Sequence, residues 1–173
     1  MKTYIVILRG INVSGKNKLP MAALRDLLND LAFENVQTYI QSGNIILDSV
    51  ENKSTIIEKI KDGIASKFGY DVPVLIRTIS EWEKAIANNP YPTENHKILG
   101  FAFLSAIPKE KIFEVNITND DAYTIIDDVA YIYCPEGMGN TKLTNNLFER
   151  KLKVTATSRN LRTTLKLLEL AKV

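Results

Sequence analysis

A glycine-rich loop that follows an apolar strand is the stretch of this chain whose residue types most directly suggest chemistry. Tyr4–Leu8 is an apolar run, and it leads into Arg9-Gly10-Ile11-Asn12-Val13-Ser14-Gly15-Lys16-Asn17. The spacing Gly-x4-Gly-Lys matches the start of a phosphate-binding P-loop, but the next position, which should supply a hydroxyl group to magnesium, is Asn17. The match therefore lacks its metal ligand.

The sequence around this loop also argues against a nucleotide-hydrolysing P-loop. In a true P-loop the helix begins at the Lys-Ser/Thr pair, so that helix-terminal amides face the phosphate. Here Pro20 marks the predicted helix start, several residues after Lys16. The strands that follow form a hairpin, and Asp48 lies at the end of its second strand. Asp48 is therefore not placed like the Walker B carboxylate of a P-loop NTPase.

Two interpretations of the loop remain open. In the first, Gly10 and Gly15 permit a tight excursion while Asn12 and Asn17 bond to the local backbone. In the second, the loop is a polar surface that faces an anion without hydrolysing it. The residues that would do so are Arg9, Asn12, Lys16 and Lys18.

The composition narrows the remaining chemistry. The chain has 173 residues, 45% apolar and 24% charged, as expected for one or two globular domains. It contains one cysteine, Cys134, and one histidine, His96, in a proline-containing loop, so we predict no metal centre and no cofactor.

No Ser/His/Asp grouping occurs, and whether the protein is an enzyme stays undecided. The start shows no signal-peptide pattern, and no run reaches membrane-span length, which predicts a cytoplasmic protein.

Charge is distributed unevenly along the chain. Residues 142–173 hold eight basic and two acidic side chains, a balance of +6, against −4 for the remainder and +2 for the whole chain. Such polarity indicates an anionic partner for the C-terminal region. The alternative is a solvated basic face, because Arg159, Arg162 and Lys166 would stack on one side of a helix.

A second glycine-containing loop, at Pro135–Lys142, precedes a predicted basic helix. Backbone amides at such a helix start, together with Lys142, could hold an anion. The competing interpretation is an ordinary turn in which Asn140 or Thr141 caps the helix.

Paired aromatic residues occur in the second half of the chain. Phe101 and Phe103 share one face of a predicted strand, and Tyr131 and Tyr133 share one face of another. RNA-recognition motifs place base-stacking rings on such strands. The consensus around these rings is missing, so packing in the core or between the two units is the favoured interpretation.

The first half of the chain predicts the element order β-α-β-β-α-β. Strands are expected at 4–8, 36–40, 44–47 and 72–78, with the last at a sheet edge because of Pro73. A helix begins at Pro20, and a second runs from Ile56 to Phe68 before Gly69. Both alternating faces of the first strand are apolar, so its second face must be covered by the other domain or another subunit.

The second half repeats this order and adds a final helix. Strands are expected at 99–104, 123–126, 129–134 and 153–157, with helices at 108–115 and 142–152. Ser158 is expected to cap the final helix and Ser80 to cap a helix in the linker. The predicted fold is α+β: two tandem ferredoxin-like (βαββαβ, α/β plait) units with an extra C-terminal helix. The predicted boundaries are residues 1–79 for the first unit, 80–96 for a linker and 97–173 for the second unit.

Four blocks of sequence resemble a bacterial domain-of-unknown-function (DUF) family. They are Ile7–Lys18, Tyr39-Ile40-Gln41-Ser42-Gly43-Asn44, Glu136-Gly137-Met138-Gly139 and Ala156-Thr157-Ser158-Arg159-Asn160. The family is marked by an N-terminal Leu-Leu-Arg-Gly-Ile-Asn-Val-Gly-Gly block, and the resemblance implies tandem ferredoxin-like plaits and no established activity. This chain differs from the family in Ser14, where Gly is usual, and in Leu161-Arg162, where Trp-Asn is common.

The polar blocks suggest a shared site, because loops that carry polar side chains often carry function. We expect the protein to bind an anionic ligand, either nucleic acid or a phosphorylated small molecule, in a polar cleft between the two units. The alternatives are a small-molecule enzyme that uses Arg and Lys to hold an anion, and a protein–protein assembly module, including a homo-oligomer. The predicted ligand-binding residues are Arg9, Asn12, Lys16, Lys18, Gln41, Ser42, Asn44, Lys142, Arg159 and Asn160.

Overall fold

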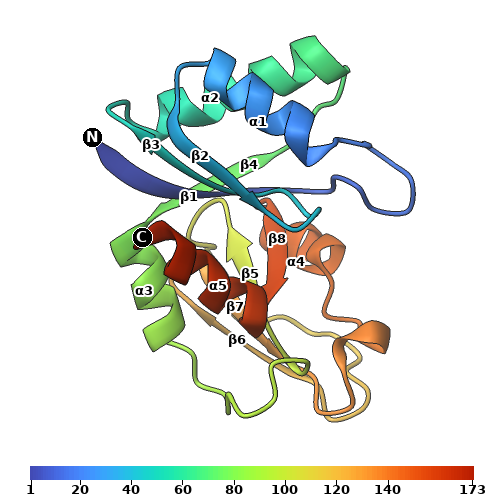
Figure 1. The fold of residues 1–173 in the computed structure, drawn as a ribbon. Coiled ribbons are helices and arrows are strands. Elements are labelled where there is room, and N and C mark those ends of the chain that lie inside the picture. Colours follow the sequence, from blue (N-terminus) through green and yellow to red (C-terminus); the bar gives the residue numbers. More distant parts are fainter. The chain divides into compact units, whose positions relative to one another are not determined.

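The computed structural model describes residues 1–173, which form a mixed α+β protein with two four-stranded antiparallel sheets and five α-helices. The chain divides into two compact units (Figure 1). The first comprises Met1–Glu83 and Leu167–Val173, and the second comprises Lys84–Lys166. The division falls inside two helices, α3 (Ile79–Ala87) and α5 (Leu161–Ala171). The boundaries predicted from the sequence stay a prediction.

The first unit contains one antiparallel sheet with the strand order β2-β3-β1-β4. Its elements are β1 (Lys2–Leu8), α1 (Met21–Asp30), β2 (Glu34–Tyr39), β3 (Asn44–Ser49), α2 (Lys53–Phe68) and β4 (Val74–Thr78). Figure 1 shows α1 and α2 on the same face of this sheet. The predicted helices and hairpin of this half are confirmed, and β4 lies at an edge, as Pro73 indicated.

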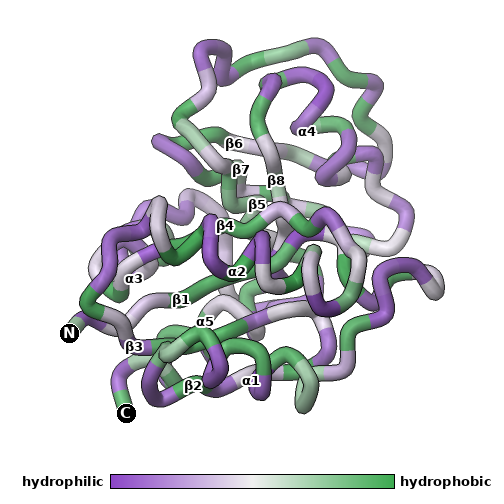
Figure 2. Tube along the Cα trace, turned by 90° about the horizontal axis from the view of Figure 1, so that it is seen from above, coloured by the Kyte–Doolittle hydropathy of each residue, from purple (hydrophilic) through white to green (hydrophobic).

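The apolar pattern of β1 explains its central position in the first sheet. Tyr4, Val6 and Leu8 belong to the core that the sheet forms with α1 and α2. Ile5 and Ile7 alternate with them and are also fully buried, so both faces of β1 are covered. Figure 2 shows the middle of this strand as strongly hydrophobic.

Local sequence signals fix the ends of α2. The Asn52 side chain accepts a hydrogen bond of 2.9 Å from the amide of Thr55, which caps the first turn. Gly69 ends the helix in the left-handed conformation, with φ of 74°, and its amide bonds to Ala65. The predicted glycine stop is therefore confirmed.

The second unit has the strand order β6-β7-β5-β8. Its elements are β5 (Leu99–Leu104), β6 (Ala122–Ile126), β7 (Val129–Tyr133), the short 3-10 helix η1 (Met138–Asn140), α4 (Asn145–Leu152) and β8 (Ala156–Asn160). β5, β6 and β7 agree with the predicted strands to within one residue at each end. The turn between β6 and β7 uses Asp127 in the left-handed conformation, with φ of 52°.

The structure corrects the prediction at several places in the second half. No helix forms at residues 108–115, where the chain is irregular although Phe113 and Val115 still pack on the core. The helix expected from Lys142 begins at Asn145, because Thr144 caps it by accepting from the Leu147 amide. The last strand lies at 156–160 rather than 153–157.

Two predicted helix caps were also wrong. The side chain of Asn160, not Ser158, accepts from the Thr163 amide at 2.8 Å at the start of α5. At α3 the Thr78 hydroxyl accepts from the Glu81 amide while the Glu81 carboxylate accepts from the Thr78 amide. This reciprocal pair is a capping box, and it begins two residues before Ser80.

Three of the four paired aromatic residues of the second unit are buried. Phe101, Phe103 and Tyr131 are fully buried, and the rings of Phe101 and Tyr131 meet edge to face at 5.2 Å. The Tyr131 hydroxyl donates to the Ala85 carbonyl, and burial, with a smaller contribution from Asp128, raises the pKa of this phenol. Tyr133 is partly exposed, and its ring stacks on Tyr91 at 5.2 Å. The burial of the other three rings favours a packing role over an exposed stacking surface. No helix in the structure has the length and apolar character that crossing a membrane requires.

Candidate functional site

In the first unit, one asparagine side chain joins the glycine-rich loop to the β2–β3 turn. The Asn12 amide nitrogen donates to the Leu19 carbonyl at 2.9 Å and to the Gln41 carbonyl at 2.8 Å. Its amide oxygen accepts from the Leu19 amide at 2.8 Å. The block at 9–18 and the block at 41–44 are therefore joined within the first unit.

The glycine and asparagine content of the loop has a conformational cause. Five of its residues have φ between 48° and 75°, and these are Gly10, Asn12, Ser14, Gly15 and Asn17. Such left-handed conformations favour Gly and are tolerated best by Asn among the other residues. Ser14 is the one member of this set that is neither Gly nor Asn.

The loop is not a P-loop. Asn17, at the position where a P-loop supplies its magnesium ligand, donates through Nδ2 to the Gly10 carbonyl at 3.0 Å. Lys16 pairs with Val13 in a short β-bridge, and the first helix begins only at Met21. Both neighbours of β1 are antiparallel, whereas a P-loop sits in a parallel sheet.

The Gln41–Asn44 turn is held by buried polar contacts. Asn44 is fully buried and donates to the Tyr39 carbonyl at 3.0 Å and to the Ser42 hydroxyl at 2.8 Å. Gly43 has φ of 76°, and a Cβ atom there would lie 2.7 Å from Leu8 Cβ. Its carbonyl accepts from the Leu8 amide at 2.8 Å. Ser42, Gly43 and Asn44 thus have a structural role in fixing the turn.

The predicted ligand-binding residues of the first unit therefore separate into two groups. Asn12, Ser42 and Asn44 make the internal hydrogen bonds described above. The exposed members are Lys16, Lys18 and Gln41, and Arg9 is partly exposed. No acidic residue lies between positions 9 and 18, so the exposed side of this loop is cationic.

In the second unit, Lys142 lies in a basic groove. The groove is about 620 Å³ and lies between α4 with its preceding loop and residues 114–116. Three cationic side chains line it, and these are Lys142, Arg150 and Lys151. Glu114 is the one acidic residue in the lining, so the groove is formally positive. Thr144 and Asn146 add polar groups near the start of α4.

Sequence reasoning identified Lys142 but missed Arg150 and Lys151 as partners in one groove. Both were counted in the basic C-terminal segment. The signal that could have found them is helical spacing, because residues 147, 150 and 151 fall on adjacent turns of one helix. The part supplied by residues 114–116 was not accessible from the sequence, since a helix was expected there.

Arg159 and Asn160 lie at the end of β8. Arg159 is buried, and its Nη1 donates to the Thr157 hydroxyl and to the Ser158 carbonyl, each at 2.8 Å. Burial lowers the pKa of this guanidinium to about 10, so it remains cationic at neutral pH. Asn160 is exposed and caps α5.

A matching arginine occurs in the first unit. Arg77 is buried at the corresponding position of β4, and its Nη1 donates to the Ile76 carbonyl at 2.9 Å. Arg77 pairs with Ile5 on β1, as Arg159 pairs with Phe101 on β5. The repeated position shows that the two units share this element as well as their strand order.

The second unit also holds two buried side chains that can ionise, Cys134 and Asp121. Cys134 is fully buried, and burial raises the pKa of its thiol. Asp121 is buried, and its Oδ1 has no hydrogen-bond partner. No group of three His, Cys, Asp or Glu side chains is placed to hold a metal ion.

Comparison with known proteins gives a family and a fold. The chain resembles the solved structure of the conserved bacterial protein SP0830 from Streptococcus pneumoniae, with a TM-score of 0.71 and 23% sequence identity over 98% of each chain. At this identity the likeness shows the fold alone. No curated protein matches the sequence. Residues 1–131 match the family DUF1697, described as a protein of unknown function, and the chain belongs to this family.

Proposed function

We propose that the protein binds a phosphate-bearing anion, either nucleic acid or a phosphorylated small molecule. The observation that carries the proposal is the groove of the second unit, where Lys142, Arg150 and Lys151 face a single acidic residue, Glu114. Lysine and arginine side chains supply the sequence-independent part of phosphate binding, and a concave site concentrates their field. The volume of about 620 Å³ lies within the range of small-molecule sites.

The loop of the first unit is a second cationic surface in this proposal. Lys16 and Lys18 are exposed on a backbone that Asn12 fixes to the neighbouring turn. A fixed backbone lowers the conformational cost of holding a ligand. The proposal also places the protein in the cytoplasm. A single buried cysteine is consistent with such a reducing compartment.

We also propose that each unit is a variant of the ferredoxin-like plait. The strand orders β2-β3-β1-β4 and β6-β7-β5-β8 support this, because both place the first and third strands of the unit at the centre. The second unit departs from the plait between β5 and β6, where irregular chain replaces the first helix. That replacement supplies one wall of the groove.

The test is a fluorescence titration with four probes: single-stranded DNA, double-stranded DNA, single-stranded RNA and a nucleoside triphosphate. Binding to an oligonucleotide that weakens steeply with salt supports nucleic acid as the ligand. Binding to the triphosphate alone supports a phosphorylated small molecule. If none of the probes binds at low ionic strength, the proposal is wrong.

Variants in each unit connect the binding to the two surfaces. Lys142→Gln with Lys151→Gln removes charge from the groove, and Lys16→Gln with Lys18→Gln removes it from the loop. If both pairs of changes weaken the binding of the same probe, both surfaces contact that ligand, and their effects on the binding free energy should add. If the groove pair leaves the affinity unchanged, the proposal is contradicted.

A further inference from the structure

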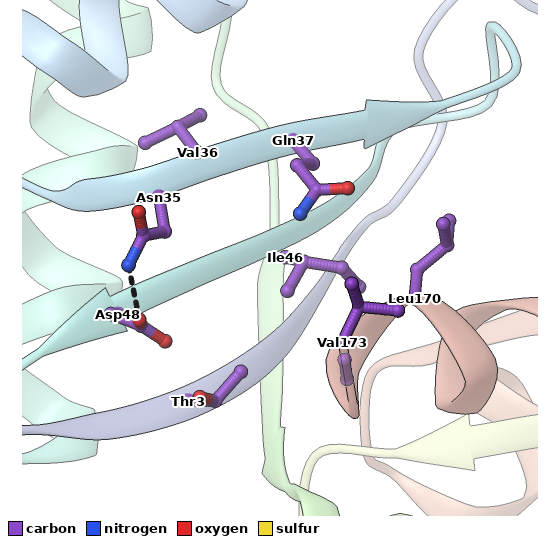
Figure 3. A pocket seen from close by; sticks show the side chains of 9 residues that line it. Thr3, Asn35, Val36, Gln37, Ile46, Asp48, Leu170 and Val173 are labelled. Carbon is purple, nitrogen blue, oxygen red and sulfur yellow. Dashed lines mark hydrogen bonds between the residues drawn. The ribbon is translucent and has the colours of Figure 1, made fainter.

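A pocket of about 390 Å³ opens on the first unit, and no residue of the cationic loop lines it. It lies on the face of the sheet opposite α1 and α2, because Thr3, Ile46 and Asp48 alternate along β1 and β3 with residues that enter the core. Figure 3 shows Asp48 and Ile46 from β3, Asn35 and Gln37 from β2 and Thr3 from β1 around it. Leu170 and Val173, from the chain end that belongs to this unit, lie beside Ile46.

A β-bulge shapes the polar side of this pocket. The pairing of β2 with β3 runs from Glu34 opposite Asp48 to Gln37 opposite Ile46, with a register shift between them. Asn35 lies in this shift with φ of 49°, and its Nδ2 donates to Asp48 Oδ2 at 2.7 Å. Bulges redirect side chains in this way, and they occur often beside functional sites. The bulge thus fixes the orientation of the Asp48 carboxylate.

The pocket presents hydrogen-bond acceptors and negative charge. Asp48 is the one ionisable side chain in its lining, and no lysine or arginine is present there. One N–H of Asn35 Nδ2 donates to Asp48 Oδ2, and Figure 3 shows the second carboxylate oxygen turned away from Asn35. The C-terminal end of α5 contributes Leu170 and Ala171, and carbonyl groups at a helix C-terminus favour a positive group.

The remaining wall is aliphatic. Ile46, Leu170 and Val173 supply it. One carboxylate beside such a wall does not match a divalent metal site, which requires several oxygen ligands around the ion. An organic cation fits both parts, since its charged end can reach the carboxylate while its hydrocarbon part covers the aliphatic side chains.

We propose that this pocket binds a small aliphatic amine. One ammonium group donates to Asp48 and to the carbonyl oxygens of the neighbouring amide side chains, and the alkyl chain lies against Ile46, Leu170 and Val173. In a diamine the second ammonium group lies at the C-terminal end of α5, where helix carbonyls favour positive charge. The site is independent of the anion-binding proposal, because it takes a ligand of opposite charge on other residues. Either proposal can fail without the other.

The experiment is an NMR titration of the full chain with putrescine, with 1,4-butanediol as the neutral analogue of the same length. We expect putrescine to shift the amide signals of Thr3, Asn35 and Asp48 in a saturable way, and the diol to leave them unchanged. Asp48→Asn keeps an oxygen that accepts from Asn35 and removes the charge. It is expected to weaken putrescine binding about tenfold, as loss of one charge-assisted hydrogen bond would.

A matched variant controls for general electrostatic attraction. Asp26→Asn removes the same charge from an exposed position on α1 and should leave the putrescine affinity unchanged. The proposal is overturned if Asp48→Asn binds putrescine as tightly as the wild type, or if Asp26→Asn weakens it equally. It is also overturned if the shifts are scattered over acidic residues outside the pocket, or if calcium chloride saturates these amides while putrescine does not.

Discussion

The Nδ2 atom of Asn12 lies 2.8 Å from the carbonyl oxygen of Gln41, across 29 positions of sequence. The same side chain makes two hydrogen bonds with Leu19, so one residue closes the glycine-rich loop and attaches it to the β2–β3 turn. The resemblance of the block at 9–17 to a phosphate-binding pattern thus has a structural origin. Because Asn12 is engaged in these internal hydrogen bonds, the exposed Lys16 and Lys18 are the loop residues that a ligand can reach.

Replacement of Asn12 by Ala should destabilise the protein by about 1–3 kcal/mol, because it leaves the Leu19 and Gln41 backbone groups without these partners. Chemical denaturation followed by circular dichroism measures the change. Asn29→Ala, at an exposed position near the end of α1, is the control and should stay within about 0.5 kcal/mol of the wild type. Equal stability of Asn12→Ala and the wild type would contradict the role assigned to this side chain.

Two glycines with the same backbone conformation should respond differently to substitution. Gly43→Ala places a Cβ atom 2.7 Å from Leu8 Cβ and 2.9 Å from Ile11 Cδ1, so we expect a loss of about 3 kcal/mol from overpacking and strain. Gly15 has φ of 75° but open space around it, so Gly15→Ala should lose only about 1 kcal/mol. Thermal and chemical unfolding of both variants tests this difference. Similar losses for the two would show that the close contact with Leu8 is relaxed at little cost.

The sequence alone was sufficient to predict the elements whose signals are local. The α2 helix has an Asn cap, a regular isoleucine spacing and a terminal glycine, and its predicted end agreed with the structure. Residues 108–115 also carry a helix-start signal at Pro108, yet they are irregular, since Phe113 stacks on Tyr123 at 4.6 Å and the Tyr123 hydroxyl bonds to the Phe113 backbone. Such tertiary contacts override a weak local preference and are not visible in the sequence.

The candidate sites also contain residues that local sequence signals identify and residues that only the tertiary structure shows. Lys16 and Lys142 could be identified because each lies in a glycine-containing loop after a strand. The groove partner Glu114 and the bulge at Asn35 could not, because both depend on how segments pair in space. Arg77 was missed for another reason: its strand reads as an ordinary edge strand, and only the register shows that it matches Arg159.

The Lys53–Glu81 ion pair should make the free energy of unfolding depend on pH in the acid range. Partial burial opposes ionisation of Glu81, but hydrogen bonds from Lys53 and from the Thr78 amide outweigh it and lower its pKa below the ordinary 4.5. A lowered folded-state pKa adds stability above the ordinary value, and this stability is lost as the pH falls through the folded-state pKa. Glu81→Gln should therefore cost about 0.5 kcal/mol at neutral pH, since the pair is largely exposed, and nothing in strong acid.

Denaturant titrations of Glu81→Gln across acid and neutral pH measure this effect. Glu58→Gln makes the same charge change at an exposed position on α2 and serves as the control. A difference between Glu81→Gln and the wild type that persists unchanged in strong acid would show that the effect does not come from ionisation of Glu81.

The single cysteine should be unreactive in the folded protein. Cys134 is fully buried, and the thiolate is the reactive form, which burial disfavours by raising the pKa. We expect iodoacetamide to modify it only as fast as the protein unfolds, and rapidly in guanidinium chloride. A Ser66→Cys variant adds an exposed thiol on α2, and mass spectrometry should show this second site modified first. Modification of both thiols at one rate would contradict the burial of Cys134.

The groove charges should determine how nucleic-acid binding depends on salt, if an oligonucleotide is the ligand. Arg150→Gln with Lys151→Gln removes two cations from the lining and should reduce the slope of log K against log salt by roughly 1.4 to 1.8. The pair Lys61→Gln with Lys67→Gln makes the same charge change on exposed positions of α2 and should leave the slope unaltered. Fluorescence titrations at several salt concentrations give both slopes. Equal slopes for the two double variants would place the phosphate contacts outside the groove, because displaced counterions report only those cations that meet phosphate.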